Sequence, residues 1–306
     1  MPVDLADPFA AEPQERARPV RDFAREYVRS PGAVLGFAVL LAIVLAAVFA
    51  PLLTPQNPYD LMQLDIMDGQ LPPGESSMAY GFNYLLGTDE QGRDIYSAIL
   101  YGLRISLGVG VVSAVSAALV GATLGLFAAY KGGRIEAAIM RLVDLQLSFP
   151  TILMALMILA LLGKGVANVV LALVLVEWAT FARTARGVGM VESRKEYIEA
   201  SYVLGIPAWR IMLRHLLPNC IPPLIVIATV QVARAISLEA TLSFLGVGVP
   251  ITEPSLGLLI SNGYQFMFSG LYWMSVYPGI ALLITIVAIN LVGDRMRDVL
   301  NPRKDA

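Results

Sequence analysis

The sequence predicts an all-α membrane protein with six transmembrane helices, and both its composition and its apolar stretches indicate this class. Hydrophobic residues make up 57% of the 306 residues and charged residues only 15%, a balance far from that of soluble domains. A helix needs about 20 predominantly apolar residues to cross the hydrocarbon core of a bilayer. The stretches that meet this length are 32–53, 105–130, 137–162, 166–186, 220–245 and 272–293.

The distribution of Lys and Arg predicts the orientation of these spans. If the N-terminus lies in the cytoplasm, every Lys and Arg except Arg93, Arg104, Lys164 and Arg234 falls in a cytoplasmic segment. Such an excess on the inner side is typical of membrane proteins. We therefore expect both termini, including the C-terminal tail 294–306, to be cytoplasmic.

Residues 1–31 are predicted to form a cytoplasmic tail ahead of the first span, 32–53. The apolar run of this span is longer than the hydrophobic region of a cleaved signal peptide, so we expect a retained anchor. At the end of the tail, RDFAREYVRSPG places Phe23, Tyr27 and Val28 at helical spacing. This pattern fits a short helix at the membrane interface, and it fits equally a solvated helix that leads into the span.

Residues 54–104 form the one long loop, which the predicted orientation places outside the cytoplasm. A long ordered loop usually docks a partner or closes a site. Its two basic residues are outnumbered by seven acidic ones, Asp60, Asp65, Asp68, Glu75, Asp89, Glu90 and Asp94. Asp89 and Asp94 are metal-ligand types, but no third ligand stands at a suitable spacing, so we expect no metal site.

Residues 105–293 are predicted to form a five-helix core that includes a cytoplasmic loop at 187–219. Gly121 and Gly125 give the second span a face of small residues, which permits close contact with another helix. Pro150 is expected to kink the third span, because proline interrupts the helical hydrogen-bond ladder.

The cytoplasmic loop contains a charged, proline-containing stretch, EYIEASYVLGIPAWRIMLRHLLPN, between two apolar spans. Ser193 and Glu196 fit a capping box, in which each side chain satisfies an orphan amide, so a helix is expected to begin near Arg194. Gly205 is the expected end of this helix, since glycine accepts the left-handed conformation that follows a last turn.

A second short helix is expected to begin with Pro207 in its first turn and to end at Pro218. Its apolar stripe consists of Trp209, Met212, Leu213 and Leu216, and its basic side of Arg210 and Arg214. The two helices and the glycine corner predict a rigid cytoplasmic protrusion. Such a protrusion fits a docking contact for a partner protein, although a cytoplasmic loop can also contain two helices that dock nothing.

A family resemblance favours the docking interpretation. The order Glu199-Ala200-Ser201, then Gly205, then Pro218 resembles the EAA loop of ABC-importer permeases, with Ser201 in place of the second alanine. In that family the loop enters a cleft on the cytoplasmic ATPase. The C-type permease of peptide and nickel importers, also used for glutathione, is similar in four further stretches, LLGTDEQGRDIYSAILYGLRISLGVG, MRLVDLQLSFP, EATLSFLGVGVP and NLVGDRMRDVLNPR.

The resemblance implies a type I ABC-importer permease fold in a bacterial inner membrane and a role in ATP-driven uptake by alternating access. The implied cargo is a dipeptide or short oligopeptide, with nickel or glutathione as alternatives. The implied partners are a homologous permease that completes a heterodimer, two ATPase subunits and an extracytoplasmic solute-binding protein. The residues that it places at the ATPase contact are Glu199, Ala200, Ser201, Gly205 and Pro218, to which the apolar stripe adds Trp209. In PSLG, Leu256 replaces the aromatic residue common in the family.

The sequence holds no motif for catalysis. The only Gly-Lys pair, Gly163-Lys164, lacks the upstream glycine and the following Ser or Thr of a P-loop, so ATP and Mg²⁺ are expected on partner subunits. The single histidine excludes HExxH, and no GxSxG occurs. We therefore expect a transport subunit that is not an enzyme and holds no cofactor, and nothing indicates a nucleic-acid partner.

Three ionisable residues, Glu177, Arg234 and Glu239, lie inside predicted spans. A charge at mid-helix costs about 2.5–3.5 kcal/mol to insert, so each needs a reason. They can line a translocation path and offer opposite charges to a zwitterionic peptide, or they can pair with each other or with a partner permease. A different class, an ATP-independent secondary transporter or channel, would use them as an ion relay, and the EAA-like loop argues against it.

Overall fold

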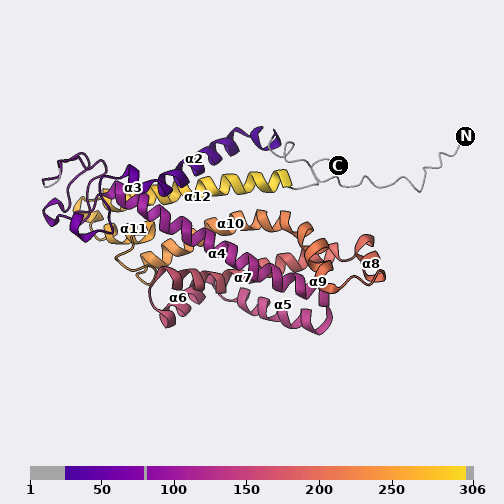
Figure 1. Ribbon diagram of the computed structural model, residues 1–306. Coiled ribbons are helices and arrows are strands. Elements are labelled where there is room, and N and C mark those ends of the chain that lie inside the picture. The colour runs from indigo at the N-terminus through magenta and orange to yellow at the C-terminus, as the bar shows by residue number, and fades with distance from the viewer. Residues whose placement is uncertain (1–24, 79–80, 301–306) are drawn as a thin grey trace, which may run out of the picture.

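The structure is a computed structural model that describes residues 25–78 and 81–300. The described part is helical, and its only β pairings are isolated bridges, Ser76 with Asn83 and Thr88 with Asp94. The long helices lie roughly side by side in an elongated bundle (Figure 1). The outer loop lies at one end of this bundle, and the short helices α8 (Glu196–Val203) and α9 (Ala208–Ile211) lie at the other (Figure 1).

The six predicted spans are confirmed as helices, one of them as a bent pair. Five helical runs are long and apolar enough to cross a membrane, and α5 with α6, bent by 94°, supplies a sixth when the pair is counted as one span. The runs are α2 (Pro31–Val48), α4 (Ile95–Lys131), α5 (Gly133–Ser148) with α6 (Thr151–Leu162), α7 (Val166–Glu192), Ala208–Phe244 with α10 (Leu217–Phe244) as its main part, and α12 (Trp273–Leu300).

Some helices differ from the predicted spans at their ends. The second span begins at Ile95 rather than at 105, because the Asp94 carboxylate accepts a hydrogen bond from the Ser97 backbone N–H at 2.9 Å and caps the helix. The first span is divided into α2 and the short α3 (Ala50–Leu53). Composition identifies the apolar middle of a span, whereas polar caps decide where its helix begins.

The kink expected at Pro150 is a complete break between α5 and α6. The Gln146 side chain crosses from α5 to α7, where its Nε2 donates to the backbone carbonyls of Leu175 at 2.5 Å and Val176 at 2.9 Å. Two ion pairs hold α5 against the C-terminal half of α7, Asp144 with Arg183 and Glu136 with Arg186. Polar side chains that reach α7 therefore hold the bend in place.

Helices α4 and α7 are in direct backbone contact. At Gly121 an added Cβ would lie 2.3 Å from the carbonyl oxygen of Trp178, and at Gly125 it would lie 2.3 Å from that of Ala182. Carbon atoms do not approach carbonyl oxygens this closely, so the two helices meet only because both α4 residues are glycine. The predicted face of small residues is confirmed, and it packs on α7.

The outer loop is organised around the buried side chain of Asp68, which closes the short helix η2 (Ile66–Asp68) after η1 (Leu61–Gln63). The Asp68 carboxylate accepts hydrogen bonds from the Ser77 hydroxyl at 2.6 Å, the Tyr84 hydroxyl at 2.8 Å and the Met78 N–H at 2.9 Å. Burial opposes ionisation, but these hydrogen bonds outweigh it and hold the pKa of Asp68 below its usual range. The predicted long loop is therefore ordered.

The outer loop is attached to the helices after α10. The indole N–H of Trp273, the first residue of α12, donates to the Thr88 carbonyl at 3.2 Å. Ser255 caps α11 (Leu256–Tyr264), which precedes the short η4 (Met267–Ser269). Leu256, where the chain departs from the family pattern, is completely buried, so this departure affects packing rather than an exposed contact.

The predicted interfacial helix is covered only in part, since Phe23 lies outside the described residues. Residues 25–28 are helical, and the Tyr27 ring meets the Phe37 ring edge-on at 6.4 Å between centroids. This contact lies at the start of α2.

We expect Gly125→Leu to keep α4 and α7 apart and to destabilise the protein. Forcing extra side-chain volume into a packed contact typically costs about 1–3 kcal/mol, and here the obstacle is backbone. Thermal unfolding of the purified protein in detergent measures the effect. Gly108→Leu on the same helix is the matched control, because nothing lies within 4 Å of the Cβ position at Gly108. Equal losses in the two variants would contradict the prediction.

Candidate functional site

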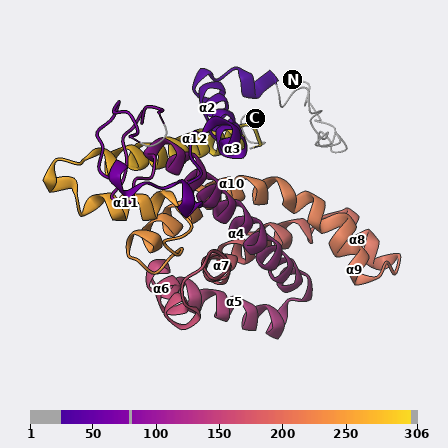
Figure 2. The ribbon, with the colours of Figure 1, turned by 60° about the vertical axis from the view of Figure 1, so that its left-hand side comes forward.

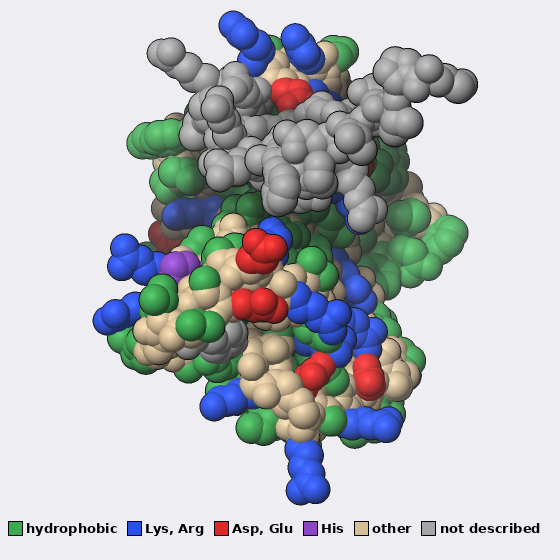
Figure 3. All heavy atoms as spheres, turned by 90° about the vertical axis from the view of Figure 1, so that its right-hand side faces the viewer, with side chains coloured by type: hydrophobic (Ala, Val, Ile, Leu, Met, Phe, Trp, Pro, Cys, Tyr) green, Lys and Arg blue, Asp and Glu red, His purple; other side chains and the backbone are tan. Residues whose placement is uncertain are grey.

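The candidate site is the projecting lobe formed by α8, the Gly205 corner and α9. In Figure 2 these elements stand away from the helix bundle. Figure 3 views this end of the molecule, where Lys and Arg side chains are spread over the face with acidic ones among them. This distribution agrees with the concentration of basic residues in the segments predicted to be cytoplasmic.

The helix α8 does not begin with the predicted capping box. Helix α7 continues to Glu192, and Ser193 therefore ends α7, with its hydroxyl donating to the Met190 carbonyl at 3.1 Å. The helix expected near Arg194 begins at Glu196. The pattern was misleading because a Ser followed by a Glu three residues later can also close one helix and open the next.

The glycine corner is confirmed. Gly205 has φ +67°, the left-handed conformation that disfavours other residues. The Ile206 N–H donates to the Ser201 carbonyl at 3.1 Å, which is the longer bond of a Schellman motif. The chain therefore reverses sharply after α8 without leaving the last helical turn open.

The predicted helix stop at Pro218 is wrong. The run that begins at Ala208 passes through the π turn η3 (Met212–Leu216) and continues into α10, with Pro218 in the first turn of α10. A proline is tolerated there because the turn before it is paired differently: the Leu217 N–H reaches back five residues to the Met212 carbonyl. The second short helix and the fifth span are therefore one helical run.

The predicted apolar stripe on this run is divided between the core and the surface. Leu216 is fully buried, together with Ile198 of α8, in a cluster that joins the lobe to α7 and α10. The Trp209 side chain is 60% exposed and that of Leu213 is 59% exposed. With Val203 and Leu204 they form an exposed apolar tip, which we call the lobe tip.

The residues matched to the EAA loop lie on different sides of α8. Glu199 and Ala200 are exposed, whereas Ser201 is buried and its hydroxyl donates to the Tyr197 carbonyl at 2.8 Å. The structure therefore brings Glu199, Ala200, Gly205 and Trp209 to one exposed lobe. Pro218 lies apart from them, on α10.

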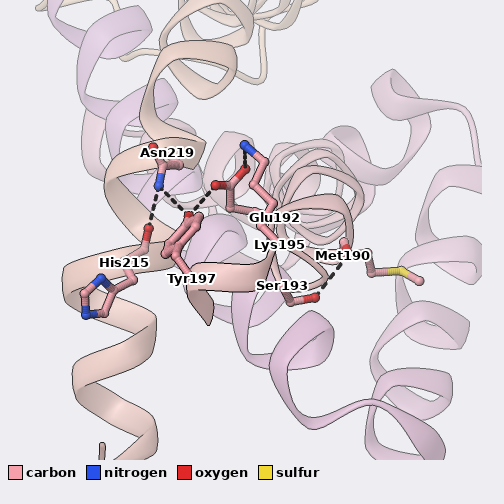
Figure 4. A network of polar contacts seen from close by, with 7 residues as sticks. All are labelled: Met190, Glu192, Ser193, Lys195, Tyr197, His215 and Asn219. Atoms are coloured by element: carbon pink, nitrogen blue, oxygen red, sulfur yellow. Dashed lines mark hydrogen bonds and ion pairs between the residues drawn. The ribbon is translucent and has the colours of Figure 1, made fainter. Parts of the chain in front are cut away.

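A polar network that the sequence analysis did not predict lies behind this lobe (Figure 4). The Tyr197 hydroxyl donates to the buried carboxylate of Glu192 and accepts from Asn219 Nδ2 at 2.9 Å. Lys195 pairs with Glu192 at 2.9 Å. Burial and the hydrogen bond to Glu192 raise the pKa of Tyr197, so this hydroxyl stays protonated. No periodic pattern links Tyr197 with Asn219, which lies in the following helical run.

The three ionisable residues inside the spans divide into two groups. Glu177 is buried, and its Oε1 lies 3.9 Å from Arg234 Nε, while Arg234 Nη2 donates to the Thr151 hydroxyl at 2.9 Å. Arg234 joins α10 to α6 and α7, and its side chain remains 49% exposed. Glu177 is therefore next to a positive charge, and Arg234 lies at the bend of the α5–α6 pair, where α6 begins.

Glu239 is held separately and is completely buried. Its carboxylate accepts hydrogen bonds from the Ser243 hydroxyl at 2.7 Å and the Ser106 hydroxyl at 2.9 Å. The Ser106 bond joins α4 to α10, and the Ser243 bond lies within α10. Of the three candidates, Arg234 is thus the one that the structure leaves accessible.

Residues 121–306 match the family described as "Binding-protein-dependent transport system inner membrane component". Residues 18–73 match the N-terminal TM domain of oligopeptide transport permease C. The dipeptide transport system permease protein DppC of Escherichia coli K12 is 38% identical, over 93% of each chain. The di/tripeptide transport system permease protein DppC of Pseudomonas aeruginosa UCBPP-PA14 is 36% identical, over 93% of this chain and 92% of its own.

Among solved structures, a chain of the inward-facing MetNI methionine ABC transporter aligns with a TM-score of 0.54. The alignment covers 66% of this chain and 96% of that chain at 21% sequence identity, and it supports the fold alone. The family match spans more than half of this chain, and the two DppC relatives span nearly all of it. The chain therefore belongs to the family of binding-protein-dependent transport system inner membrane components, as an ABC-importer permease.

Proposed function

We propose that this permease imports peptides, above all dipeptides or short oligopeptides, as one half of a heteromeric pathway. The observation that carries the coupling part of this proposal is the lobe, in which a capped helix and a glycine corner expose Glu199 and an apolar tip. The DppC relatives, named for dipeptide and di/tripeptide transport, support the cargo class. Nickel and glutathione are the alternative cargoes.

The proposed partners are a homologous permease, two ATPase subunits that bind ATP and Mg²⁺, and an extracytoplasmic binding protein. The lobe lies at the end of the bundle opposite the outer loop (Figure 1). With the N- and C-termini in the cytoplasm, the lobe faces the ATPases and the outer loop faces the binding protein. This arrangement belongs to a bacterial inner membrane and is supported by the family.

The proposed mechanism is alternating access driven by the ATPases. When the ATPases close on ATP they move the lobe, and this movement rotates the helical core from an inward-open to an outward-open state. Glu199, Gly205 and Trp209 transmit the force. The closed C-terminal turn of α8 suits this role, because the Ile206–Ser201 bond holds the Gly205 corner to the helix when the lobe is displaced.

Arg234 is the proposed cargo contact within the path. Its guanidinium is half exposed beside the buried carboxylate of Glu177, so the pair offers the positive charge of Arg234 to the carboxylate of a zwitterionic peptide. An ionisable side chain at membrane depth normally faces a bundle interior or a water-filled cavity. Glu239, enclosed by serine hydroxyls, is assigned a structural role instead.

The experiment that tests the proposed function uses the full complex reconstituted in lipid. Its ATPase rate is measured with the binding protein empty, dipeptide-loaded, longer-peptide-loaded, glutathione-loaded or nickel-loaded. Stimulation by a peptide-loaded form supports the proposal. Stimulation by the nickel-loaded or glutathione-loaded form alone would show that nickel or glutathione, and not a peptide, is the cargo. Cargo uptake by this chain without ATPase subunits would overturn the importer mechanism in favour of a secondary transporter.

We expect Gly205→Leu to separate ATP hydrolysis from transport. Nothing lies within 4 Å of the Cβ position, so the added side chain meets no atom, but the left-handed backbone costs a non-glycine residue about 1–2 kcal/mol. The backbone at residue 205 should leave the left-handed conformation and open the corner. Peptide uptake should then fall while ATP hydrolysis continues. Gly187→Leu, at an open position of ordinary helical conformation in α7, is the matched control. Unchanged uptake in the Gly205 variant would refute the role of the corner.

We expect the double variant Glu177→Gln with Arg234→Met to assemble but to lose peptide uptake. Removing Arg234 alone leaves a buried carboxylate without its counter-charge, which is typically worth about 3–5 kcal/mol of destabilisation, so the double variant isolates the role in transport. Size-exclusion chromatography measures assembly and proteoliposome uptake measures transport. Normal uptake in the double variant would show that the pair is only structural.

A further inference from the structure

The base of α10 is poorly held by its own backbone. Pro218, Pro222 and Pro223 have no backbone N–H, so the carbonyl groups four residues before them receive no α-helical hydrogen bond. The π turn η3 directly precedes these prolines. Helices bend at prolines and at π turns. A displacement of α8 or α9 would therefore be absorbed at this base unless another contact stiffened it.

A side-chain contact spans Pro218, the first proline of this base. Asn219 Nδ2 donates one hydrogen bond to the Tyr197 hydroxyl of α8 at 2.9 Å and one to the His215 carbonyl at 2.8 Å (Figure 4). The Tyr197 hydroxyl in turn donates to Glu192 at the end of α7. A single hydroxyl therefore joins the end of α7, the first turn of α8 and the first turn of α10, which lies within the proline-rich base.

The anchor of this contact is itself well fixed. The Glu192 side chain is buried, and its second carboxylate oxygen pairs with Lys195 at 2.9 Å. Hydrogen bonds to a carboxylate are shorter and stronger than those between neutral groups. The apolar contacts of Ile198 beneath α8 bury surface, but hydrophobic burial does not depend on the angle between the helices. The hydrogen bonds of Tyr197 depend on geometry and therefore specify one orientation of α8 against α10.

We propose that the contact between Tyr197 and Asn219, here called the Tyr197–Asn219 latch, positions α8 on α10 and passes the displacement of α8 to the membrane helices. The inference rests on the proposed function, in which an ATPase moves the lobe. Tyr197 and Asn219 are positioning residues, since they act through the helices that they join and not through contact with cargo or nucleotide.

The latch leads directly to the candidate cargo contact. From Asn219, Arg234 lies about 22 Å farther along α10 at 1.5 Å per residue. Arg234 there binds Thr151, the first residue of α6, and lies beside Glu177 of α7. If a movement of the α10 base passes Pro222 and Pro223, it therefore reaches the α5–α6 bend and the accessible guanidinium of Arg234 together.

The first test measures the latch itself in the reconstituted complex. Spin labels are attached to the variants Val203→Cys on α8 and Ile221→Cys on α10, which are both exposed positions. The single native cysteine is first removed by Cys220→Ala. We expect Tyr197→Phe, which removes one oxygen, to widen the distribution of distances between the labels. Asn219→Ala removes the contact from the other side and should do the same. An unchanged distribution in both variants overturns the latch.

The second test measures coupling as peptide molecules imported per ATP hydrolysed. We expect uptake by Tyr197→Phe to fall roughly tenfold, equivalent to about 1.4 kcal/mol, while hydrolysis continues. Tyr272→Phe is the matched control, because the Tyr272 hydroxyl donates no hydrogen bond to the described residues and lies beside Trp273, at the end of the bundle that carries the outer loop. A fall in uptake and hydrolysis together, or the same ratio as the unaltered complex, contradicts the positioning role.

The two tests separate failure of the latch from failure of the proposed function. If the unaltered complex imports no peptide with ATP, the proposed function fails, and the label distances still decide whether Tyr197 positions α8. If the unaltered complex imports peptide and Tyr197→Phe keeps both its label distances and its coupling ratio, only the latch is refuted.

Discussion

The backbone contact between α4 and α7 is the interaction on which the rest of the structure depends. Gly121 and Gly125 allow the two helices to meet at carbonyl oxygens, and α7 becomes a fixed support. Its middle carbonyls receive the Gln146 side chain, so the α5–α6 bend is attached to it. Its last residue, Glu192, receives Tyr197, so the lobe is attached to it as well. Without this contact, neither the bend nor the lobe would have a fixed neighbour.

The breaks in helical structure follow from the bilayer as a solvent. An unpaired backbone group in hydrocarbon costs several kcal/mol, so a broken helix needs donors or acceptors from elsewhere. Gln146 lies just before the α5–α6 break and donates to α7, and Asn219 lies in the proline-rich base of α10 and donates to the His215 carbonyl. In both places the side-chain amide beside a break donates to backbone, that of the unbroken α7 for Gln146 and that of the preceding turn for Asn219. Each of these two breaks therefore lies next to a side-chain contact that holds its position.

The sequence predicted what depends on local chemistry and missed what depends on contacts between distant segments. Apolar runs predicted the spans, and Gly205 predicted the corner, because each is a property of adjacent residues. Ser193 and Pro218 were assigned to the wrong ends of helices, since the same residue can end one helix or begin another. The pairing of Tyr197 with Asn219 joins different helices, and no spacing rule identifies it. Pairing among Glu177, Arg234 and Glu239 was one of two alternatives, and the structure shows it for Glu177 with Arg234. The family resemblance located the site, but the structure was needed to show which of its residues are exposed.

The difference between Glu239 and Arg234 supports the proposed second permease subunit. Burying a polar group is tolerated when hydrogen bonds replace those to water, and Ser106 and Ser243 supply them for Glu239 within one chain. Arg234 contacts Thr151 and Glu177 and still exposes about half of its side chain in the middle of a spanning helix. Lipid is a poor neighbour for that guanidinium. Its exposed side therefore requires water or a second protein, and a water-filled path between two permease subunits would provide both.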